Sequence, residues 1–193
     1  MTTLFASTYR HPLLTGEDIE KIASAHSRHK MGKGQVLLKE GQTANEYYIL
    51  ESGLVRAYVL DYEGNEITTE FFTEGEIVIV PTSLFQRIPS SETLVTLTDA
   101  VLWRMGFEEF QMLFHGIPGM SEWGRSWFAT QLFSMKQRSL DMITQTATHR
   151  YLKLMKEKPQ IVRYVPLKQI ASYLGITSSS LSRIRKEIAH EVD

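Results

Sequence analysis

The spacing of hydrophobic and polar positions changes twice along the chain and divides it into three regions. In the first, Thr15 followed by Asp18 resembles a helix-capping pair, and Ile19, Ile22 and Ala23 form an apolar stripe at helical spacing. The period then becomes two, and glycines recur every 7 to 12 residues, at Gly34, Gly41, Gly53, Gly64 and Gly75. The pattern predicts a helix followed by a β-rich region.

The runs between these glycines have the length and composition of single strands. They include YYILES, LVRAYVLD and ITTEFF, and the sequence DYEGN at 61–65 predicts a hairpin tip. Each glycine is expected where the chain turns with a positive φ. Strand character continues through IVIV and LVTLTDAVLWRM as far as Gly106. The region therefore predicts a rolled antiparallel sheet.

A return to helical spacing follows Gly106, and a long helix is predicted from Met120 to about Thr148. Five residues of this helix are spaced 4, 3, 4 and 3 positions apart, which is typical of the packing seam between two helices. They are Phe128, Leu132, Met135, Ser139 and Met142. The favoured interpretation is a dimerisation helix. The alternative is that the stripe packs on its own β-domain, and Trp123, Trp127 and Phe133 on neighbouring faces suggest additional intrachain contacts.

The segment 165–188, VPLKQIASYLGITSSSLSRIRKEI, predicts two short helices around a glycine turn. Ile170, Ala171 and Leu174 form one apolar face, Gly175 supplies the turn, and Ile176 is expected to plug the core. Thr177 is predicted to cap a second helix, which Leu181 and Ile184 anchor. The positions left outside the core are groove-reading residue types, namely Ser178, Ser179, Ser182, Arg183 and Lys186. The alternative is an ordinary helical hairpin with a solvated basic face.

Charge distribution favours the DNA-binding interpretation. Residues 149–186 carry nine Lys and Arg against a single acid, Glu157, which gives this segment a net charge of +8. Because the whole chain nets −1, the remaining residues carry −9. A polyanionic partner for the C-terminal region is the simplest physical account of this asymmetry.

Composition removes several other classes of function. The chain has no cysteine, which excludes disulfides, thiolate catalysis and cysteine-ligated iron–sulfur clusters. No apolar run approaches the roughly 20 residues of a membrane span, and no secretory leader is recognised, so a cytoplasmic protein without membrane contact is expected. His26 and His29 lie three apart near a predicted helix end, and two surface histidines are a better interpretation than a metal site. No catalytic motif is present, and no enzyme is predicted.

The order of a glycine-punctuated β-roll, a long helix and a helix-turn-helix resembles the Crp/Fnr family of bacterial transcription regulators. The most specific segments are GQVLLKEGQTANEYYILESGLVRAYVLDYEGNE and IASYLGITSSSLSRIRKEI, with THRYLKLMKEKP as a junction between them. The resemblance implies an α+β fold with an antiparallel β-roll of the double-stranded β-helix or jelly-roll type and flanking helices. It implies a sensor domain over 1–118, a dimerisation helix over 119–147 and a helix-turn-helix domain over 148–193, its wing reduced or absent.

The same resemblance implies homodimers that bind double-stranded DNA, work with RNA polymerase, and hold a small effector in the β-roll. Base and phosphate contacts carry over to Thr177, Ser178, Ser179 and Arg183. Members that read a well-known catabolite operator have arginine and glutamate where this chain has Ser178 and Ser179, so a different operator is expected. Without a wing, phosphate anchoring falls more on Lys168, Arg185 and Lys186.

Cyclic-nucleotide-binding members use a glutamate for the ribose and an arginine for the phosphate. The resemblance places Val80 and Ser91 at those two positions, so cyclic AMP is not expected to be the effector. The effector is unknown. Candidates to line its pocket are Tyr58, Phe72, Gly75, Val78, Val80, Pro81, Arg87, Ser90, Ser91 and Thr93. For the apolar members the alternative is plain core, and Ser90 and Ser91 fit an exposed turn equally well.

Two other classes of function stay open at this point. One is a small-molecule sensor or cyclic-nucleotide-binding protein whose C-terminal helices make protein contacts. The other is a cupin-like enzyme, which requires a metal cluster inside the strands. Residues 34–106 contain no histidine, which makes the enzyme the weakest of the three.

Overall fold

The second of the two N-terminal helices begins where the sequence places a cap. A computed structural model describes residues 2–192, beginning with α1 (Thr2–Thr8) and α2 (Gly16–Ser24). The Asp18 amide donates to Thr15 Oγ1 at 3.2 Å, and the Thr15 amide donates to Asp18 Oδ2 at 2.9 Å. Ile19, Ile22 and Ala23 are buried along one face of α2. The predicted start and stripe of this helix are confirmed.

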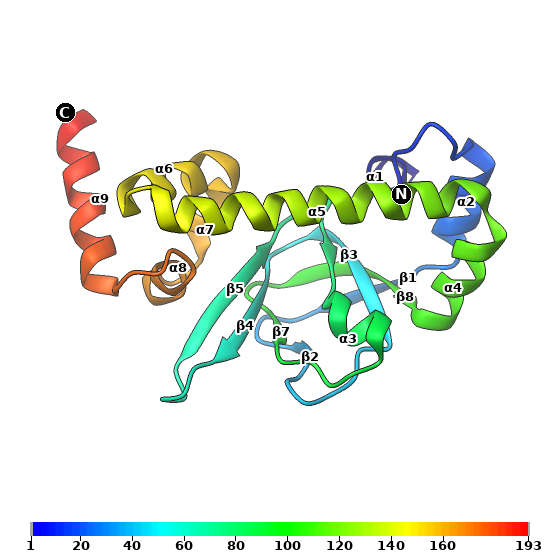
Figure 1. Cartoon of the computed structure of the whole chain (residues 1–193), viewed down its shortest axis with the longest axis horizontal. Helices are drawn as coiled ribbons and strands as arrows, with labels where there is room; N and C mark the ends of the chain where they lie inside the picture. The colour runs from blue at the N-terminus through cyan, green and yellow to red at the C-terminus, as the bar shows by residue number, and fades with distance from the viewer. Residues whose placement is uncertain (1, 193) are drawn as a thin grey trace. The chain divides into compact units, whose positions relative to one another are not determined.

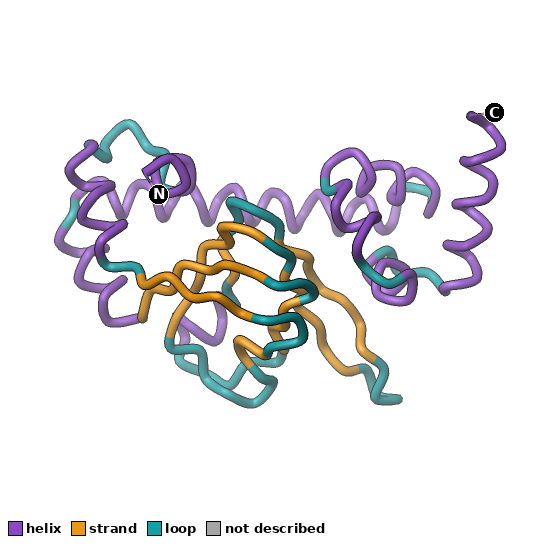
Figure 2. Tube along the Cα trace, turned by 180° about the vertical axis from the view of Figure 1, so that it is seen from behind, coloured by secondary structure: helices purple, strands orange, loops and turns teal. Residues whose placement is uncertain are grey.

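The β-rich region forms two four-stranded antiparallel sheets (Figure 2). One has the strand order β1-β8-β3-β6, with its members at Ser27–Met31, Ala100–Gly106, Glu46–Ser52 and Ile77–Val78. The other has the order β2-β7-β4-β5, with its members at Val36–Leu38, Thr93–Thr96, Val55–Leu60 and Glu66–Phe72. All five predicted turn glycines have a positive φ, from 80° to 98°. The expected β-roll is therefore confirmed.

Gly53 is the glycine on which the roll depends most. Its φ is +98°, and a Cβ atom there would lie 2.5 Å from the Asp99 carbonyl oxygen and 2.8 Å from Ala100 Cα. Both neighbours are backbone atoms, which cannot move without displacing the start of β8. The turn between β3 and β4 therefore requires glycine for its conformation and for its lack of a side chain.

The sequence IVIV does not continue as a strand. β6 covers only Ile77 and Val78, and Val80 is the N-cap of a short helix, α3 (Pro81–Gln86). Pro81 at the first helical position favours this helix because its fixed φ suits a helix start and its missing N–H is not needed there. Arg87 ends α3 in the left-handed region at φ 57°.

The predicted long helix begins and ends somewhat earlier than expected. α4 spans Phe107–Gly116, and α5 runs without a break over Pro118–Thr144 (Figure 1). The expected extension to Thr148 is wrong because Thr146 caps a new helix, with its Oγ1 accepting the His149 amide at 3.2 Å.

The C-terminal helices confirm the predicted turn. They are α6 (Ala147–Glu157), α7 (Pro159–Tyr164), α8 (Leu167–Tyr173) and α9 (Ser178–Val192). Ile170, Ala171, Leu174, Leu181 and Ile184 are buried, and Gly175 has φ +67°. Ile176 is only half-buried, so its expected role as a core plug is partly correct. The segment thus folds as two helices around a glycine turn.

The described chain divides into two compact units. The first holds the residues up to Arg56 together with Phe72–Phe133, and the second holds Ala57–Phe71 with the chain from Ser134 onward. The tip of the β4–β5 hairpin and all four C-terminal helices therefore belong to the second unit.

The core of the first unit contains a chain of neutral polar groups. The Tyr9 hydroxyl lies 2.6 Å from that of Tyr47 and 3.2 Å from His26 Nε2. His26 Nδ1 donates to the Ile22 carbonyl at 2.8 Å, which leaves Nε2 to accept from Tyr9. Burial lowers the pKa of His26 to about 4 and raises the pKa of both tyrosines. The prediction that His26 is a surface histidine is wrong.

No helix among residues 2–192 combines the length and apolar character that crossing a bilayer requires. The same residues contain no group of three or more histidine, aspartate or glutamate side chains arranged to hold a metal ion.

Candidate nucleic-acid interface and effector cavity

The face of α9 opposite its buried side carries the residues predicted to read DNA. Leu181 and Ile184 are 0% and 6% exposed and fix α9 on the rest of its unit. Because a helix turns once every 3.6 residues, Ser178, Ser182 and Lys186 lie in one row along the opposite face. Ser179 and Arg183 form the adjacent row, and Arg185 lies at the margin of this polar face.

Hydroxyl side chains surround the N-terminus of α9 and bond to one another and to its backbone. Thr177 Oγ1 accepts the Ser180 amide at 3.2 Å and lies 2.9 Å from the hydroxyls of Ser179 and Ser180. The predicted cap is confirmed. No bulky side chain occupies the first turn of the helix, so a duplex backbone could approach its free amide groups closely.

The cationic side chains of this region extend into solvent. Lys168 on α8 is exposed, as are Arg185 and Lys186 on α9. Arg183 is also exposed and has Glu187 as its neighbour one turn later, at 3.9 Å. An ion pair of that length at an exposed site is weak, so the guanidinium stays available for a phosphate or a guanine edge.

Side chains of α5 and α6 stabilise the helical unit through hydrogen bonds, an ion pair and packing. Arg150 Nη2 donates to the Leu174 carbonyl at 2.9 Å, which satisfies an otherwise unpaired group at the end of α8. Lys153 Nζ on α6 donates to Asp141 Oδ2 on α5 at 2.7 Å, and this lysine, followed by Gln137, lowers the pKa of Asp141. Met142 of α5 closes over Gly175, where a Cβ would meet its Cε at 2.5 Å.

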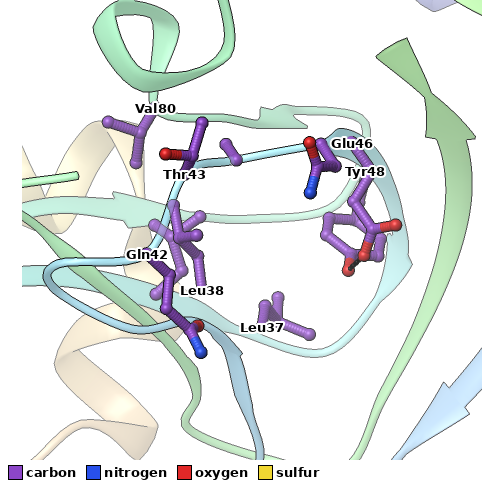
Figure 3. A pocket seen from close by; sticks show the side chains of 10 residues that line it. Leu37, Leu38, Gln42, Thr43, Glu46, Tyr48 and Val80 are labelled. Carbon is purple, nitrogen blue, oxygen red and sulfur yellow. Dashed lines mark hydrogen bonds between the residues drawn. The ribbon is translucent and has the colours of Figure 1, made fainter. Parts of the chain in front are cut away.

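A cavity of about 510 Å³ opens in the first unit, beside the loop between β2 and β3 (Figure 3). Its apolar lining comes from β2, the β2–β3 loop, the N-cap of α3 and β7, namely Leu37, Leu38, Ala44, Val80 and Leu94. Its polar lining consists of Gln42, Thr43, Asn45, Glu46 and Tyr48. A mixed lining of this kind is typical of a small-molecule site.

The charged groups around the cavity are engaged with protein partners. Glu46 accepts from the Tyr48 hydroxyl and forms an ion pair with Arg104. Arg87 Nη1 donates to the Ala44 carbonyl at 2.6 Å, and its Nη2 donates to Asn45 Oδ1. The Arg87 guanidinium also lies 4.7 Å from the centroid of the Phe107 ring.

Of the ten residues predicted to line an effector pocket, Val80 alone lines this cavity. Val78 is fully buried in β6 opposite Tyr48, and Tyr58 belongs to the second unit. Ser90 is buried and bonds to the Glu92 backbone, whereas Ser91 is exposed. Phe72, Gly75, Pro81 and Thr93 also lie outside the lining, as does Arg87. The sequence does not predict that the β2–β3 segment lines a cavity, because its composition is that of an ordinary strand followed by a turn.

The stripe predicted on α5 is exposed. Phe128 is 40%, Leu132 64%, Met135 70% and Met142 39% exposed, and Ser139 is exposed as well. Trp123 is buried and Trp127 is half-buried, in keeping with the intrachain contacts expected of them, and Phe128 also meets Phe85 edge-on at 5.4 Å. Phe133 is 70% exposed, so the intrachain contact expected of it is wrong.

The β-rich region is similar to domains of known proteins. Residues 28–116 match the family model of the cyclic nucleotide-binding domain. A cAMP-dependent protein kinase regulatory subunit from Colletotrichum orbiculare is 30% identical over 107 residues, which are 55% of this chain and 26% of that protein. A type II regulatory subunit from Drosophila melanogaster is 25% identical over 101 residues. The chain thus spans about a quarter of the length of these curated relatives.

Solved structures extend the similarity to nearly the whole chain. The c-di-GMP responsive global regulator CLP from Xanthomonas campestris has a TM-score of 0.71 at 18% identity, covering 92% of this chain and 93% of that one. A protein assigned to the Crp/Fnr family of transcriptional regulators, from Eubacterium rectale, has the same TM-score at 18% identity, covering 95% and 88%. The catabolite activator protein of Thermus thermophilus has a TM-score of 0.59 at 21% identity, covering 95% and 87%.

The β-rich region matches the model of the cyclic nucleotide-binding domain over residues 28–116, and the curated relatives with a similar region are regulatory subunits. The whole chain then has the fold of the Crp/Fnr-family transcription regulators, so the resemblance predicted from the sequence is confirmed.

Proposed function

We propose that this protein is a homodimeric, DNA-binding transcription regulator in which α9 reads the major groove and the β-roll responds to a small effector. The observation that carries the proposal is the polar and basic face of α9, opposite Leu181 and Ile184, on a helix whose first turn carries only short hydroxyl side chains. Direct readout of base edges needs both an unobstructed approach and donors such as Arg183.

The first experiment selects bound sequences from random duplexes at two salt concentrations with the purified protein. An enriched site with two-fold symmetry is expected, and binding should weaken steeply as salt rises because phosphate contacts release counterions. Arg183→Ala should relax base preference at one position per half-site and weaken binding to the selected site by about 1 to 3 kcal/mol. Arg125→Ala is the matched control, because Arg125 is also exposed on a helix beside an acid, Glu122.

Binding without sequence enrichment would contradict sequence-specific readout by α9. Absence of binding at both salt concentrations would instead favour the sensor whose C-terminal helices contact protein. That second function is supported by the 30% identity over 107 residues with a cAMP-dependent protein kinase regulatory subunit.

The dimer part of the proposal rests on the exposed stripe of α5. Leu132 and Met135 are 64% and 70% exposed, and exposed apolar surface in a continuous row is typical of an interface. Leu132→Glu is expected to shift the protein from dimer to monomer in sedimentation equilibrium. Thr130→Glu, on the opposite side of the same helix, should leave the dimer intact. A monomeric wild-type protein would contradict this assignment.

We further propose that the effector is not cyclic AMP. Val80 is 2% exposed at the start of α3, where the resemblance places the ribose-binding glutamate, and Ser91 offers no cation for a phosphate. An unpaired phosphate in such a site would be costly to desolvate. Cyclic AMP should produce no saturable rise in the melting temperature, and a clear saturable rise would contradict the proposal.

A further inference from the structure

The cavity beside the β2–β3 loop has a buried apolar floor and an exposed polar rim (Figure 3). Leu38, Val80 and Leu94 form the floor and are 8%, 2% and 2% exposed. Gln42 and Asn45 are exposed and form part of the rim. A volume of about 510 Å³ is within the range that holds a small organic molecule. A floor and a rim of this kind suit a molecule with one apolar and one polar part.

The β2–β3 loop that carries the rim is held in place by bonds to two helices. The Ala44 amide donates to Ser83 Oγ of α3 at 2.8 Å, and Ser83 is fully buried. The Asn45 carbonyl accepts the Phe107 amide at the start of α4, also at 2.8 Å. Because these bonds fix the shape of the loop before a ligand arrives, less conformational entropy is lost when a ligand binds.

Two amide side chains at the rim have their oxygens engaged and their NH₂ groups left over. Gln42 Oε1 accepts the Lys39 amide at 3.2 Å, and Asn45 Oδ1 accepts from Arg87 Nη2. Within residues 2–192 neither NH₂ group has a hydrogen-bond partner, and the hydroxyl of the half-buried Thr43 has none either. The rim therefore offers donors, and a ligand group that accepts hydrogen bonds is its complement.

The cavity offers no counter-charge to an ionised ligand. Among the described residues that line it, Glu46 is the one acid, and there is no lysine, arginine or histidine. The Glu46 carboxylate already accepts from the Tyr48 hydroxyl and forms an ion pair with Arg104. An anionic ligand would lose its hydration without gaining a cation, and a cationic ligand would compete with Arg104 for Glu46. An uncharged ligand avoids both costs.

Arg87 joins the loop to the end of α3 in an uncommon backbone conformation. Its φ is +57°, and it is the one residue other than glycine with a positive φ in the part of the chain that the structure describes. Its Nη1 donates to the Ala44 carbonyl at 2.6 Å, and its guanidinium lies against the Phe107 ring. A left-handed conformation is unfavourable for a residue with a side chain, and such residues cluster at ligand sites. Arg87 thus supports the rim from outside the lining.

We propose that this cavity binds an uncharged amphipathic molecule, with its apolar part on the buried floor and a neutral carbonyl oxygen accepting hydrogen bonds from the Gln42 and Asn45 side chains. Acyl amides, esters and ketones belong to this class, whereas nucleotides and ionised fatty acids do not. The role of this molecule as the effector rests on the proposed function, but its binding to the cavity does not.

The first test compares three probes of equal length, octanamide, octanoate and octylammonium, which are neutral, anionic and cationic near neutral pH. Each is titrated into the full-length protein while NMR follows the methyl groups of Leu38, Val80 and Leu94. Octanamide should shift all three saturably, with a millimolar dissociation constant because it has only about ten non-hydrogen atoms. The charged probes should bind about tenfold more weakly or worse. No saturable shift with octanamide, or tighter binding of a charged probe, would overturn the proposal.

A variant of the rim tests the amide donor. Gln42→Glu keeps an oxygen for the Lys39 amide but replaces the NH₂ group with a negative charge. It should weaken octanamide binding by roughly fivefold or more and make octylammonium the preferred probe.

Gln35→Glu is the matched control for this variant. Gln35 is also exposed, and its Oε1 also accepts an amide three residues earlier, that of Gly32 at 2.9 Å, but it lies outside the cavity lining. Its substitution should leave the order of the three probes unchanged. Equal effects of the two variants, or no effect of Gln42→Glu, would overturn the assignment of the rim as the polar half of the site.

A titration with DNA separates the ligand site from the proposed function. Saturating octanamide should change the affinity of the wild-type protein for its selected operator by about fivefold or more and leave that of Gln42→Glu unchanged. Unchanged operator affinity in wild-type protein that binds the probe would overturn the effector role. If the protein binds the probe but no duplex, the proposed function fails and the ligand site stands.

Discussion

The two compact units each contain a cluster of polar side chains, and the clusters differ in chemistry and in exposure. In the first unit Tyr9, His26 and Tyr47 are neutral, aromatic and buried, and they bond mainly to one another. In the second, Arg138, Lys158 and Glu70 are charged, and their side chains are 35%, 20% and 38% exposed. The first cluster has no alternative partner in water, whereas the second can exchange its partners for solvent.

This difference indicates which unit can rearrange at low cost. Neutral groups in a dry core lose their bonds completely when the core opens, so the first unit is expected to open only on global unfolding. Partly exposed charges lose less because water replaces the lost partner. The β-roll core is therefore expected to be the more rigid part, and the ion pairs of Glu70 with Arg138 and Lys158 should open at lower cost.

Gly53→Ala is the variant expected to destabilise the first unit most. The new Cβ would meet the Asp99 carbonyl at 2.5 Å in a residue whose φ is +98°. We expect a loss of about 4 kcal/mol in the free energy of unfolding of the first unit, from clash and strain together. All three tryptophans lie in this unit, so their fluorescence during urea unfolding reports it.

Gly41→Ala is the matched control, because Gly41 lies in the same unit and also has a positive φ, +84°, but has nothing within 4 Å of an added Cβ. It should cost only about 1 kcal/mol. Equal losses in the two variants would show that φ alone matters and that the contact with Asp99 does not.

The pH dependence of the first unit should come largely from His26. Its pKa falls to about 4 in the fold because burial disfavours the charged ring, and its packed neighbours Phe5, Tyr9 and Tyr47 are uncharged. Between about pH 6.5 and pH 4 the unfolded chain binds a proton that the folded chain does not. The free energy of unfolding should therefore fall by up to roughly 3 kcal/mol as pH decreases through that window.

His26→Gln retains a donor and an acceptor but does not titrate. It should lower stability near pH 7 and remove most of the slope between pH 4 and 6.5 measured in urea titrations. His29→Gln leaves His26 in place and should retain the slope. A steep slope that survives in His26→Gln would assign the acid sensitivity to other groups.

Gly175→Ala tests the second unit in the same way. Gly175 has φ +67°, and its Cβ would meet Met142 Cε at 2.5 Å, which is the tip of a flexible side chain and not backbone. We expect a loss of about 1 to 2 kcal/mol, less than at Gly53, because Met142 can change rotamer. Faster hydrogen exchange in α8 and α9 measures this loss, and Met142→Ala should recover part of it. No recovery would mean that φ strain accounts for the whole effect.

The helical regions were more readily predicted than the cavity, for local reasons. Thr15, Thr177 and the turn glycines act through their immediate neighbours, so their roles can be recognised in a few consecutive residues. The cavity combines β2 and the adjoining β2–β3 loop with Val80 and Leu94, which are distant from them in sequence and share no period with them. α3 was missed because IVIV is a good strand sequence and Pro81 alone redirects the chain. Burial of His26 depends on tertiary packing, which its position near a helix end does not indicate.

The hairpin tip at residues 61–65 is a natural place to attach a reporter. Asp61 Oδ1 accepts the amides of Glu63 and Asn65 at 2.9 and 2.8 Å, so the tip maintains its own shape. Tyr62 is 96% exposed, and the β5 strand that contacts α8 begins only a few residues later. A fluorophore at Tyr62 would leave both cores undisturbed while following the movement of this strand in real time. The tip would thus allow the protein to be converted into an optical biosensor before its effector is identified.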